Sequence, residues 1–227
     1  MTDRQVLVTG CPRSGTLYMA RLLKLVGVPV RHEKWRPGCG IVDWGLMAGL
    51  HLVDYIPDFD NAIVLHQVRN PISTIESMQT MRQSSLRKLC SHSGASLEDA
   101  PLVRLAKAWL FWNAQIETFA DITYRVEDIH NGSETWCRLC ELLNIATETP
   151  VPKLDRSIHT RQARYEPLDA QGLHASIGDR WYGAIQRKAL AYGYAIKSSI
   201  ECDSEDDRVT ERQTIGFGES YIARRSV

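Results

Sequence analysis

The stretch that decides the fold is Val6-Leu-Val-Thr-Gly-Cys-Pro-Arg-Ser-Gly-Thr-Leu-Tyr18, which reads as a short buried strand, a turn bounded by glycines and the start of a helix. In such a unit the backbone N–H groups of the turn and the helix N-terminus face an anion. Gly10 and Gly15 have the spacing of the two glycines in the phosphate-binding motif G-x-x-x-x-G-K-[ST]. We therefore expect this loop to cradle a phosphorylated ligand.

The residues after the second glycine differ from those of a nucleoside triphosphatase. Thr16 and Leu17 stand where such an enzyme has a lysine for the outer phosphates and a hydroxyl residue for magnesium. Leucine cannot ligate a metal, and the cation inside this loop is Arg13. The loop therefore predicts a ligand that is bound without the usual magnesium–nucleotide contacts.

A second motif follows a near-continuous apolar run over Ala62–Val68, which is typical of a central parallel strand. Arg69 comes directly after the run, and Asn70-Pro71 is a good N-cap with a first-turn proline. Ligands collect at the carboxyl ends of strands in open α/β sheets, and the planar guanidinium group suits phosphate. We expect Arg69 to lie beside the first loop, and Ser77 follows it by eight residues.

The two motifs together resemble the P-loop sulfotransferases, which use 3′-phosphoadenosine 5′-phosphosulfate (PAPS). The first loop resembles their 5′-phosphosulfate loop, and Arg69 with Ser77 resembles their 3′-phosphate motif. The resemblance implies an α/β three-layer fold in which helices flank a central parallel sheet. It also implies transfer of a sulfuryl group from PAPS to a hydroxyl or amine, without a metal. The nucleotide-binding residues that it implies are Arg13, Ser14, Gly15, Thr16, Leu17, Arg69 and Ser77.

The resemblance also suggests a general base. Relatives use either a histidine further along the chain or a glutamate after the second strand, and the G-V-x-x-x-x-E run that ends at Glu33 resembles the bacterial and marine branch. Adjacent residues on an extended segment point to opposite faces, so we expect only one of His32 and Glu33 to reach the acceptor. We favour Glu33, with His32 as the alternative and a surface ion pair of Glu33 as the non-catalytic interpretation. Trp35 would supply the apolar wall that makes the carboxylate basic.

Three further assignments depend on the resemblance. Arg13 would stabilise the charge that develops on the departing oxygen, which makes it the third catalytic candidate. Arg161 or Arg164 would close over the 3′-phosphate. Val126 stands where relatives have a tyrosine that approaches adenine, so this adenine contact is in doubt.

The remaining pattern alternates strands and helices. We expect strands at Gln5–Thr9, Val28–Arg31, Ala62–Val68 and residues 122–126, and helices at Thr16–Val26, Ile72–Met81, Glu98–Phe119, Glu134–Leu143 and Gly178–Tyr194. This order predicts a parallel sheet with helices on both faces. We interpret Gly38–Trp44 as a turn, and we expect residues 35–55 and the polar stretch Thr80–Ala100 to line the acceptor pocket. One domain should cover residues 1–197, and residues 198–227 should form a polar, peripheral tail.

Composition excludes some classes. The 27 basic residues balance 27 acidic ones, which argues against a nonspecific nucleic-acid binder. No apolar stretch is long enough for a membrane span, and the chain enters its first strand too soon for a secretory signal, so we expect a cytoplasmic protein. The C-x-x-C of Cys137 and Cys140 lies in a helical pattern without further metal ligands, which indicates packed thiols.

Two other functions remain compatible with the sequence. One is a magnesium-dependent P-loop kinase of small molecules, against which Thr16 and Leu17 argue. The other is a nucleotide-binding module without turnover, which would keep Arg13, Arg69 and Ser77 but would be insensitive to changes at Glu33. The acceptor, a small molecule or glycan, and the oligomeric state are not predicted.

Overall fold

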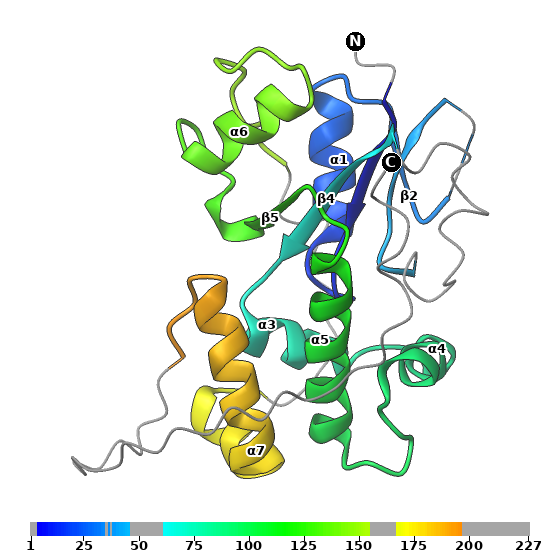
Figure 1. Cartoon of the computed structure of the whole chain (residues 1–227), viewed down its shortest axis with the longest axis vertical. Helices are drawn as coiled ribbons and strands as arrows, with labels where there is room; N and C mark the ends of the chain where they lie inside the picture. The colour runs from blue at the N-terminus through cyan, green and yellow to red at the C-terminus, as the bar shows by residue number, and fades with distance from the viewer. Residues whose placement is uncertain (1–3, 35, 37, 46–60, 155–166, 197–227) are drawn as a thin grey trace.

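The computed structural model describes residues 4–34, 36, 38–45, 61–154 and 167–196. Its centre is a sheet of five parallel strands in the order β2-β3-β1-β4-β5. Their bounds are Val6–Thr9 for β1, Val30–His32 for β2, Gly40–Val42 for β3, Ile63–Val68 for β4 and Ile122–Arg125 for β5. This sheet, flanked by helices, confirms the α/β architecture expected from the sequence (Figure 1).

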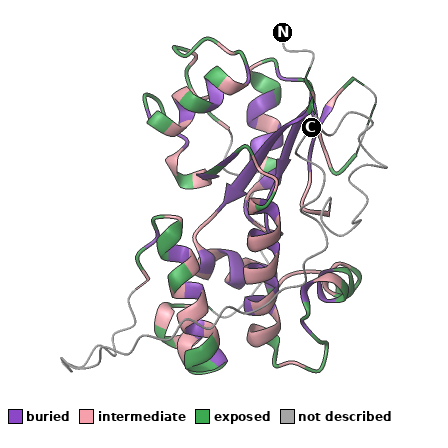
Figure 2. Ribbon diagram, in the orientation of Figure 1, coloured by how far each residue is buried: buried purple, intermediate pink, exposed green. Residues whose placement is uncertain are grey.

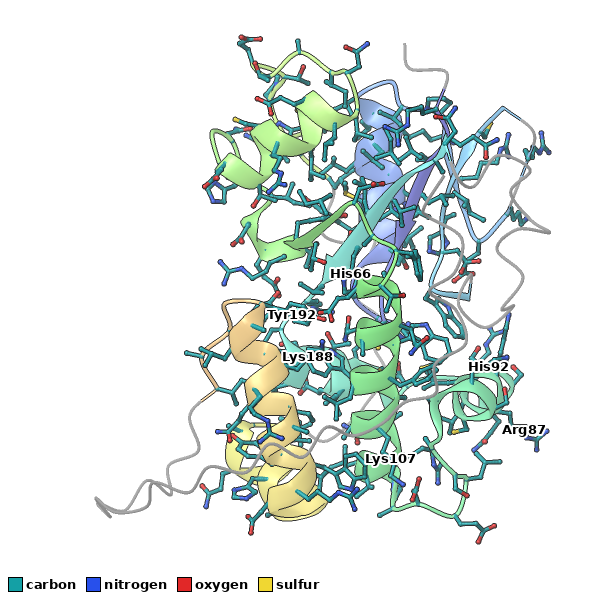
Figure 3. All side chains as sticks on the ribbon, in the orientation of Figure 1. His66, Arg87, His92, Lys107, Lys188 and Tyr192 are labelled. Carbon is teal, nitrogen blue, oxygen red and sulfur yellow. The ribbon has the colours of Figure 1, made fainter. Side chains whose placement is uncertain are left out.

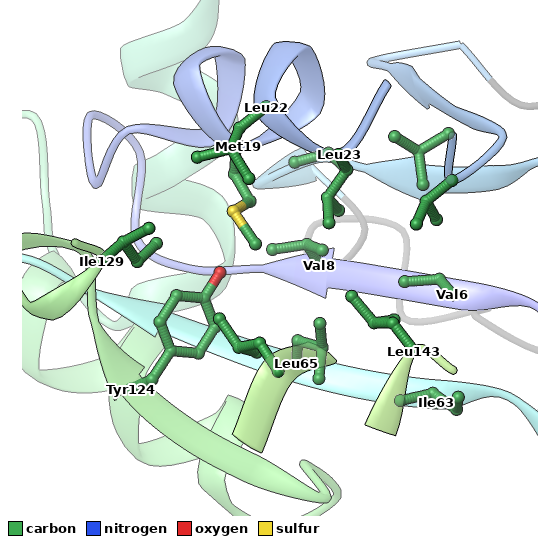
Figure 4. Close-up of a cluster of buried hydrophobic side chains, with 14 of the residues drawn as sticks. Val6, Val8, Met19, Leu22, Leu23, Ile63, Leu65, Tyr124, Ile129 and Leu143 are labelled. Atoms are coloured by element: carbon green, nitrogen blue, oxygen red, sulfur yellow. The ribbon is translucent and has the colours of Figure 1, made fainter. Parts of the chain in front are cut away.

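One face of the sheet is covered by α1 (Thr16–Leu25) and α6 (Glu134–Leu142). Met19, Leu22 and Leu23 of α1 are fully buried against Val8 of β1 and its neighbours (Figure 4). These residues recur at helical spacing, and burial of each such side chain contributes about 1.5–3 kcal/mol. This cluster fixes α1, whose N-terminus directly follows the loop that the sequence predicts to bind phosphate.

The other helices are α3 (Pro71–Met78), α4 (Gln83–Ser93), α5 (Pro101–Glu117) and α7 (Ala170–Ala191). Directly after α5, Phe119 and Ala120 pack on the second face of the sheet, against the buried cluster that contains Leu7 and Val64. Figure 1 shows α3, α4 and α7 grouped around the rest of α5, beyond the carboxyl ends of the strands. The strands β1, β3 and β4 are buried along their whole length, whereas the outer strands β2 and β5 are buried only in part, and exposed residues gather on the outer sides of the helices (Figure 2).

Two expectations about secondary structure were wrong, and one helix was not predicted. The segment Gly38–Trp44 is not only a turn, because it contains β3, which lies between β2 and β1. The polar stretch Thr80–Ala100 contains α4, whose Leu89, Cys90 and Ser93 are buried. Helix α7 begins at Ala170 rather than at Gly178, where the chain has a φ of 74° and kinks.

The spacing predicts that Trp181, Ile185, Leu190 and Tyr194 face inward in this last helical segment. Ile185 and Tyr194 are buried as expected, but Leu190 is exposed, and the buried face of α7 includes Tyr182 and Ala189. Within the described residues no helix is both long and apolar enough to cross a membrane. The expected tail, residues 198–227, lies outside the described part of the chain.

Candidate functional site

The loop between β1 and α1 has the backbone conformation of an anion cradle. Arg13 and Gly15 both adopt the left-handed region, with φ of 72° and 98°. Gly15 is the N-cap of α1, no side chain caps the helix, and its first turn has no acidic residue. Alternation of right- and left-handed residues turns successive N–H groups toward one point, and the helix dipole favours negative charge there.

The Gln67 side chain of β4 fixes this loop by a hydrogen bond to its backbone. Its Nε2 donates to the carbonyl of Ser14 at 2.6 Å, and its Oε1 accepts from the Tyr124 hydroxyl at 2.9 Å. The chain of β4 also passes so close to the loop that a Cβ on Gly10 would lie 2.2 Å from the Gln67 carbonyl oxygen. We did not predict this role for Gln67, although a glutamine inside an apolar strand is a signal for a buried polar contact.

The two phosphate motifs meet at this loop. Arg69 Nη1 donates to the carbonyl of Arg13 at 3.2 Å. Arg13 Nη2 in turn donates to Thr80 Oγ1 at 3.1 Å, and Thr80 Oγ1 donates to the carbonyl of Ser77 at 2.9 Å. Arg13, Arg69 and the carboxyl end of α3 therefore lie together at the loop between β1 and α1. Thr80 connects Arg13 to Ser77, a contact that the sequence did not suggest.

Two side chains of the loop bear on the fit of an anionic ligand. Ser14 is 1% exposed, and its Oγ has no hydrogen-bond partner among the described residues. A phosphoryl or sulfuryl oxygen would satisfy such a hydroxyl, so the residues present fit a group of this kind. Burial raises the pKa of the Cys11 thiol well above its usual value, so Cys11 adds no negative charge to the cradle.

His32 and Glu33 lie next to the loop, but their arrangement differs from the expected one. His32 Nε2 is 3.3 Å from Thr16 Oγ1 and 3.9 Å from Glu33 Oε1. The segment is not extended at Glu33, whose φ is 54°, so the two side chains approach each other instead of pointing to opposite faces. The expectation that only one of them could face the acceptor was therefore based on a wrong backbone conformation. Trp35, the expected wall, lies outside the described residues.

A polar cavity of about 350 Å³ opens beside Glu33. The described residues that line it come from the ends of β2 and β3 and from α4: Glu33, Asp43, Trp44, Gly45, Ser84, Ser85 and Lys88. Burial raises the pKa of Asp43 above its ordinary value, while the hydrogen bond from the Gly45 N–H lowers it, the Glu33 charge raises it and the Lys88 charge lowers it. Asp43 was not predicted from the sequence, because the strand that it follows, β3, is only three residues long.

The strand β4, which ends next to the candidate phosphate loop, carries a buried histidine. His66 is fully buried, with Nε2 at 3.0 Å from Asn113 Oδ1 and Nδ1 at 3.1 Å from Thr123 Oγ1. Figure 3 places it near Tyr192 and Lys188 of the α7 region, and its ring packs edge-on against that of Tyr192. Burial lowers the pKa of His66 to about 4, so the ring is neutral near pH 7.

Glu127 connects the Arg69 turn to the end of α7. Its Oε1 accepts from the Asn70 N–H at 2.9 Å, and its Oε2 accepts from the Tyr194 hydroxyl at 2.6 Å. The neighbouring Val126 lies beside the phosphate loop, 3.5 Å from where a Cβ on Gly15 would be. Both basic candidates for the 3′-phosphate, Arg161 and Arg164, lie outside the described residues.

Comparisons with known proteins give a likeness among the solved structures. No family model matches the chain, and no curated protein matches it. Among solved structures, a sulfotransferase domain from the curacin biosynthetic pathway is similar to it with a TM-score of 0.53 and 16% sequence identity. The match covers 86% of this chain and 99% of that one. At this identity the likeness concerns the fold, and the chain has a sulfotransferase-like fold.

Proposed function

We propose that this chain is a PAPS-dependent sulfotransferase that moves a sulfuryl group to a hydroxyl or amine. The observation that carries the proposal is the contact between the two motifs, in which Arg69 Nη1 lies 3.2 Å from the Arg13 carbonyl oxygen. Two cationic side chains and an uncapped helix N-terminus at one place suit a ligand with more than one anionic group. The sulfotransferase-like fold supports the same function.

The proposed roles follow the positions of the side chains. The N–H groups of the loop, with the hydroxyls of Ser14 and Thr16, would hold the 5′ end of the nucleotide, and Leu17 would contribute only backbone. Arg69 and Ser77 would hold the 3′-phosphate. Bound PAPS supplies an activated sulfuryl group, and Arg13 would stabilise the negative charge on the oxygen that departs.

A proton acceptor is also needed, because the attacking hydroxyl must lose its proton as the new bond forms. Glu33 is the candidate from the sequence, and His32 is its alternative. Both lie between the phosphate loop and the polar cavity, since His32 contacts Thr16 and Glu33 lines the cavity.

A thermal-shift series tests the proposal without knowledge of the acceptor. We expect 3′-phosphoadenosine 5′-phosphate (PAP) to stabilise the protein far more than AMP, because only PAP carries the 3′-phosphate that Arg69 would bind. ATP with magnesium is the third ligand of the series. If it stabilises the protein more than PAP does, the chain is a P-loop kinase and the proposal is wrong.

A further inference from the structure

The register of β2 and β3 brings two carboxylates out of the sheet side by side. His32 pairs with Val42, so Glu33 and Asp43 are the next residues on neighbouring parallel strands, and the Glu33 N–H donates to the Val42 carbonyl at 3.1 Å. The Asp43 N–H donates to the carbonyl of Val8 in β1 at 3.0 Å. Asp43 therefore leaves the sheet between Glu33 and the beginning of the phosphate loop.

The two carboxylates differ in their surroundings. The Glu33 side chain is 51% exposed, whereas Asp43 is half-buried and its Oδ1 accepts from the Gly45 N–H at 2.7 Å. Trp44, which lines the cavity beside Asp43, is held by Trp112, whose indole N–H donates to the Trp44 carbonyl at 3.1 Å. A partly desolvated carboxylate on a fixed support is a stronger base than one that moves freely in water.

The opposite wall of the cavity comes from α4. Ser84, Ser85 and Lys88 face the two carboxylates there, and Trp44 is the only aromatic among the described lining residues. Carboxylates accept hydrogen bonds from hydroxyl groups, Lys88 donates them, and serines do both. This lining suits a molecule with several hydroxyl groups better than a flat apolar one.

We propose that this cavity is the acceptor site, that it takes a compact polyhydroxylated molecule, and that Asp43 removes the proton from the attacking hydroxyl. The proposal rests on the sulfotransferase function proposed above. In the step, the acceptor oxygen forms a bond to sulfur and its proton passes to the Asp43 carboxylate. The bond between sulfur and the bridging oxygen breaks, and its electron pair leaves with PAP.

Parallel substitutions test the role of Asp43. Asp43→Asn and Glu33→Gln are compared with wild type, and Arg87→Gln on the exposed side of α4 (Figure 3) is the control. PAP binding is measured by thermal shift, and turnover is measured as PAP release from PAPS with water alone and with panels of monosaccharides, phenols and primary amines. We expect Asp43→Asn to lose turnover about 100-fold or more with unchanged PAP binding. Glu33→Gln should lose less, and Arg87→Gln should match wild type.

The pH profile separates a base from a merely structural side chain. Among the described residues, the charged and titratable groups that face Asp43 are Glu33, His32 and Lys88. Since the Lys88 charge lowers the pKa of Asp43 and the Glu33 charge raises it, Lys88→Gln should move the acid limb of kcat/KM to higher pH. Glu33→Gln should move it to lower pH. If Asp43 had only a structural role, the acid limb of kcat/KM would stay at the same pH in both variants.

Each other outcome has a distinct meaning. Wild-type turnover in Asp43→Asn, or no turnover of PAPS by a wild-type protein that binds PAP, overturns the role of Asp43. Preferred sulfation of phenols or amines overturns the acceptor class, as does the absence of sulfation of any monosaccharide. Failure of the wild-type protein to bind PAP defeats the proposed function itself.

Discussion

The donor side and the acceptor side of the candidate site are built in different ways. On the donor side, the loop after β1 is fixed by backbone contacts, by Gln67 and by the arginine contact at 3.2 Å. The acceptor side is a polar cavity whose described walls come from the ends of β2 and β3 and from α4. The comparison teaches that the candidate anion cradle is built from the backbone, while the proposed acceptor cavity is lined by side chains that can be exchanged more freely.

Gly10→Ala should have the largest effect and tests how rigid the donor side is. The new Cβ would lie 2.2 Å from the Gln67 carbonyl oxygen, so the loop and β4 must separate. We expect a loss of about 3 kcal/mol in the free energy of unfolding, measured by urea denaturation, together with loss of PAP binding. Gly183→Ala in α7 is the control, because its Cβ would meet no atom closer than the Arg187 Nη1 at 3.4 Å. Equal stability of the two variants would show that the loop can move to accommodate a Cβ at position 10.

Acid should destabilise the protein through His66, which lies buried in β4. The unfolded state binds a proton at His66 below its ordinary pKa of about 6.5, whereas the folded state does so only near 4. Stability should therefore fall as the pH drops from about 6.5 to 4, by roughly 3 kcal/mol in total from this residue. His66→Gln should remove this part of the slope in urea denaturation at several pH values. The same slope in both proteins would contradict the buried neutral histidine.

Arg69→Ala tests whether the second motif belongs to the donor side. Loss of a hydrogen bond to a charged group costs roughly 1.5–3 kcal/mol, which corresponds to about ten- to a hundred-fold in the Kd for PAP. Binding of AMP should change much less, because AMP lacks the 3′-phosphate. Arg138→Ala, an exposed arginine of α6, is the control for charge alone. An equal loss for PAP and AMP would remove Arg69 from the 3′-phosphate site.

The smallest expected effect is on stability, when one hydroxyl group is removed from the proposed donor side or from the proposed acceptor side. Tyr124→Phe removes the donor to Gln67 Oε1 and should cost about 1 kcal/mol, because that buried oxygen loses its partner. Ser85→Ala, which changes a half-buried wall of the cavity, should alter stability by less than about 0.5 kcal/mol. Thermal unfolding of both variants measures the difference. A larger loss of stability in Ser85→Ala than in Tyr124→Phe would contradict the difference expected between the two sides.

The sequence predicted that the first loop and Arg69 lie together, because the motifs that contain them are each continuous in the chain. The glycine spacing around Arg13 and the cap after Arg69 are local signals, and the parallel sheet brings them together. The acceptor side depends on β3, whose three residues begin with a glycine and resemble a turn. Asp43 became recognisable only once the register with β2 was known.

Helix α4 left a weaker signal in the sequence. Leu86, Leu89, Cys90 and Ser93 recur at helical spacing, but we described this stretch only as polar and predicted no helix in it. A serine on a buried face does not register as apolar, so the periodicity is easily missed. Helix α7 was shortened for the opposite reason, because Gly178 was interpreted as a boundary although the chain only kinks there.

The hydrogen bonds of the Glu127 carboxylate link the Arg69 turn to the segment that follows α7. The carboxylate accepts from Asn70, next to Arg69, and from Tyr194, close to the last described residue. A ligand that steadies the Arg69 turn should also slow hydrogen exchange of the amides around Tyr194, far away in sequence. Removal of the chain from Tyr194 onward should in turn weaken nucleotide binding, although Tyr194 does not line the phosphate loop.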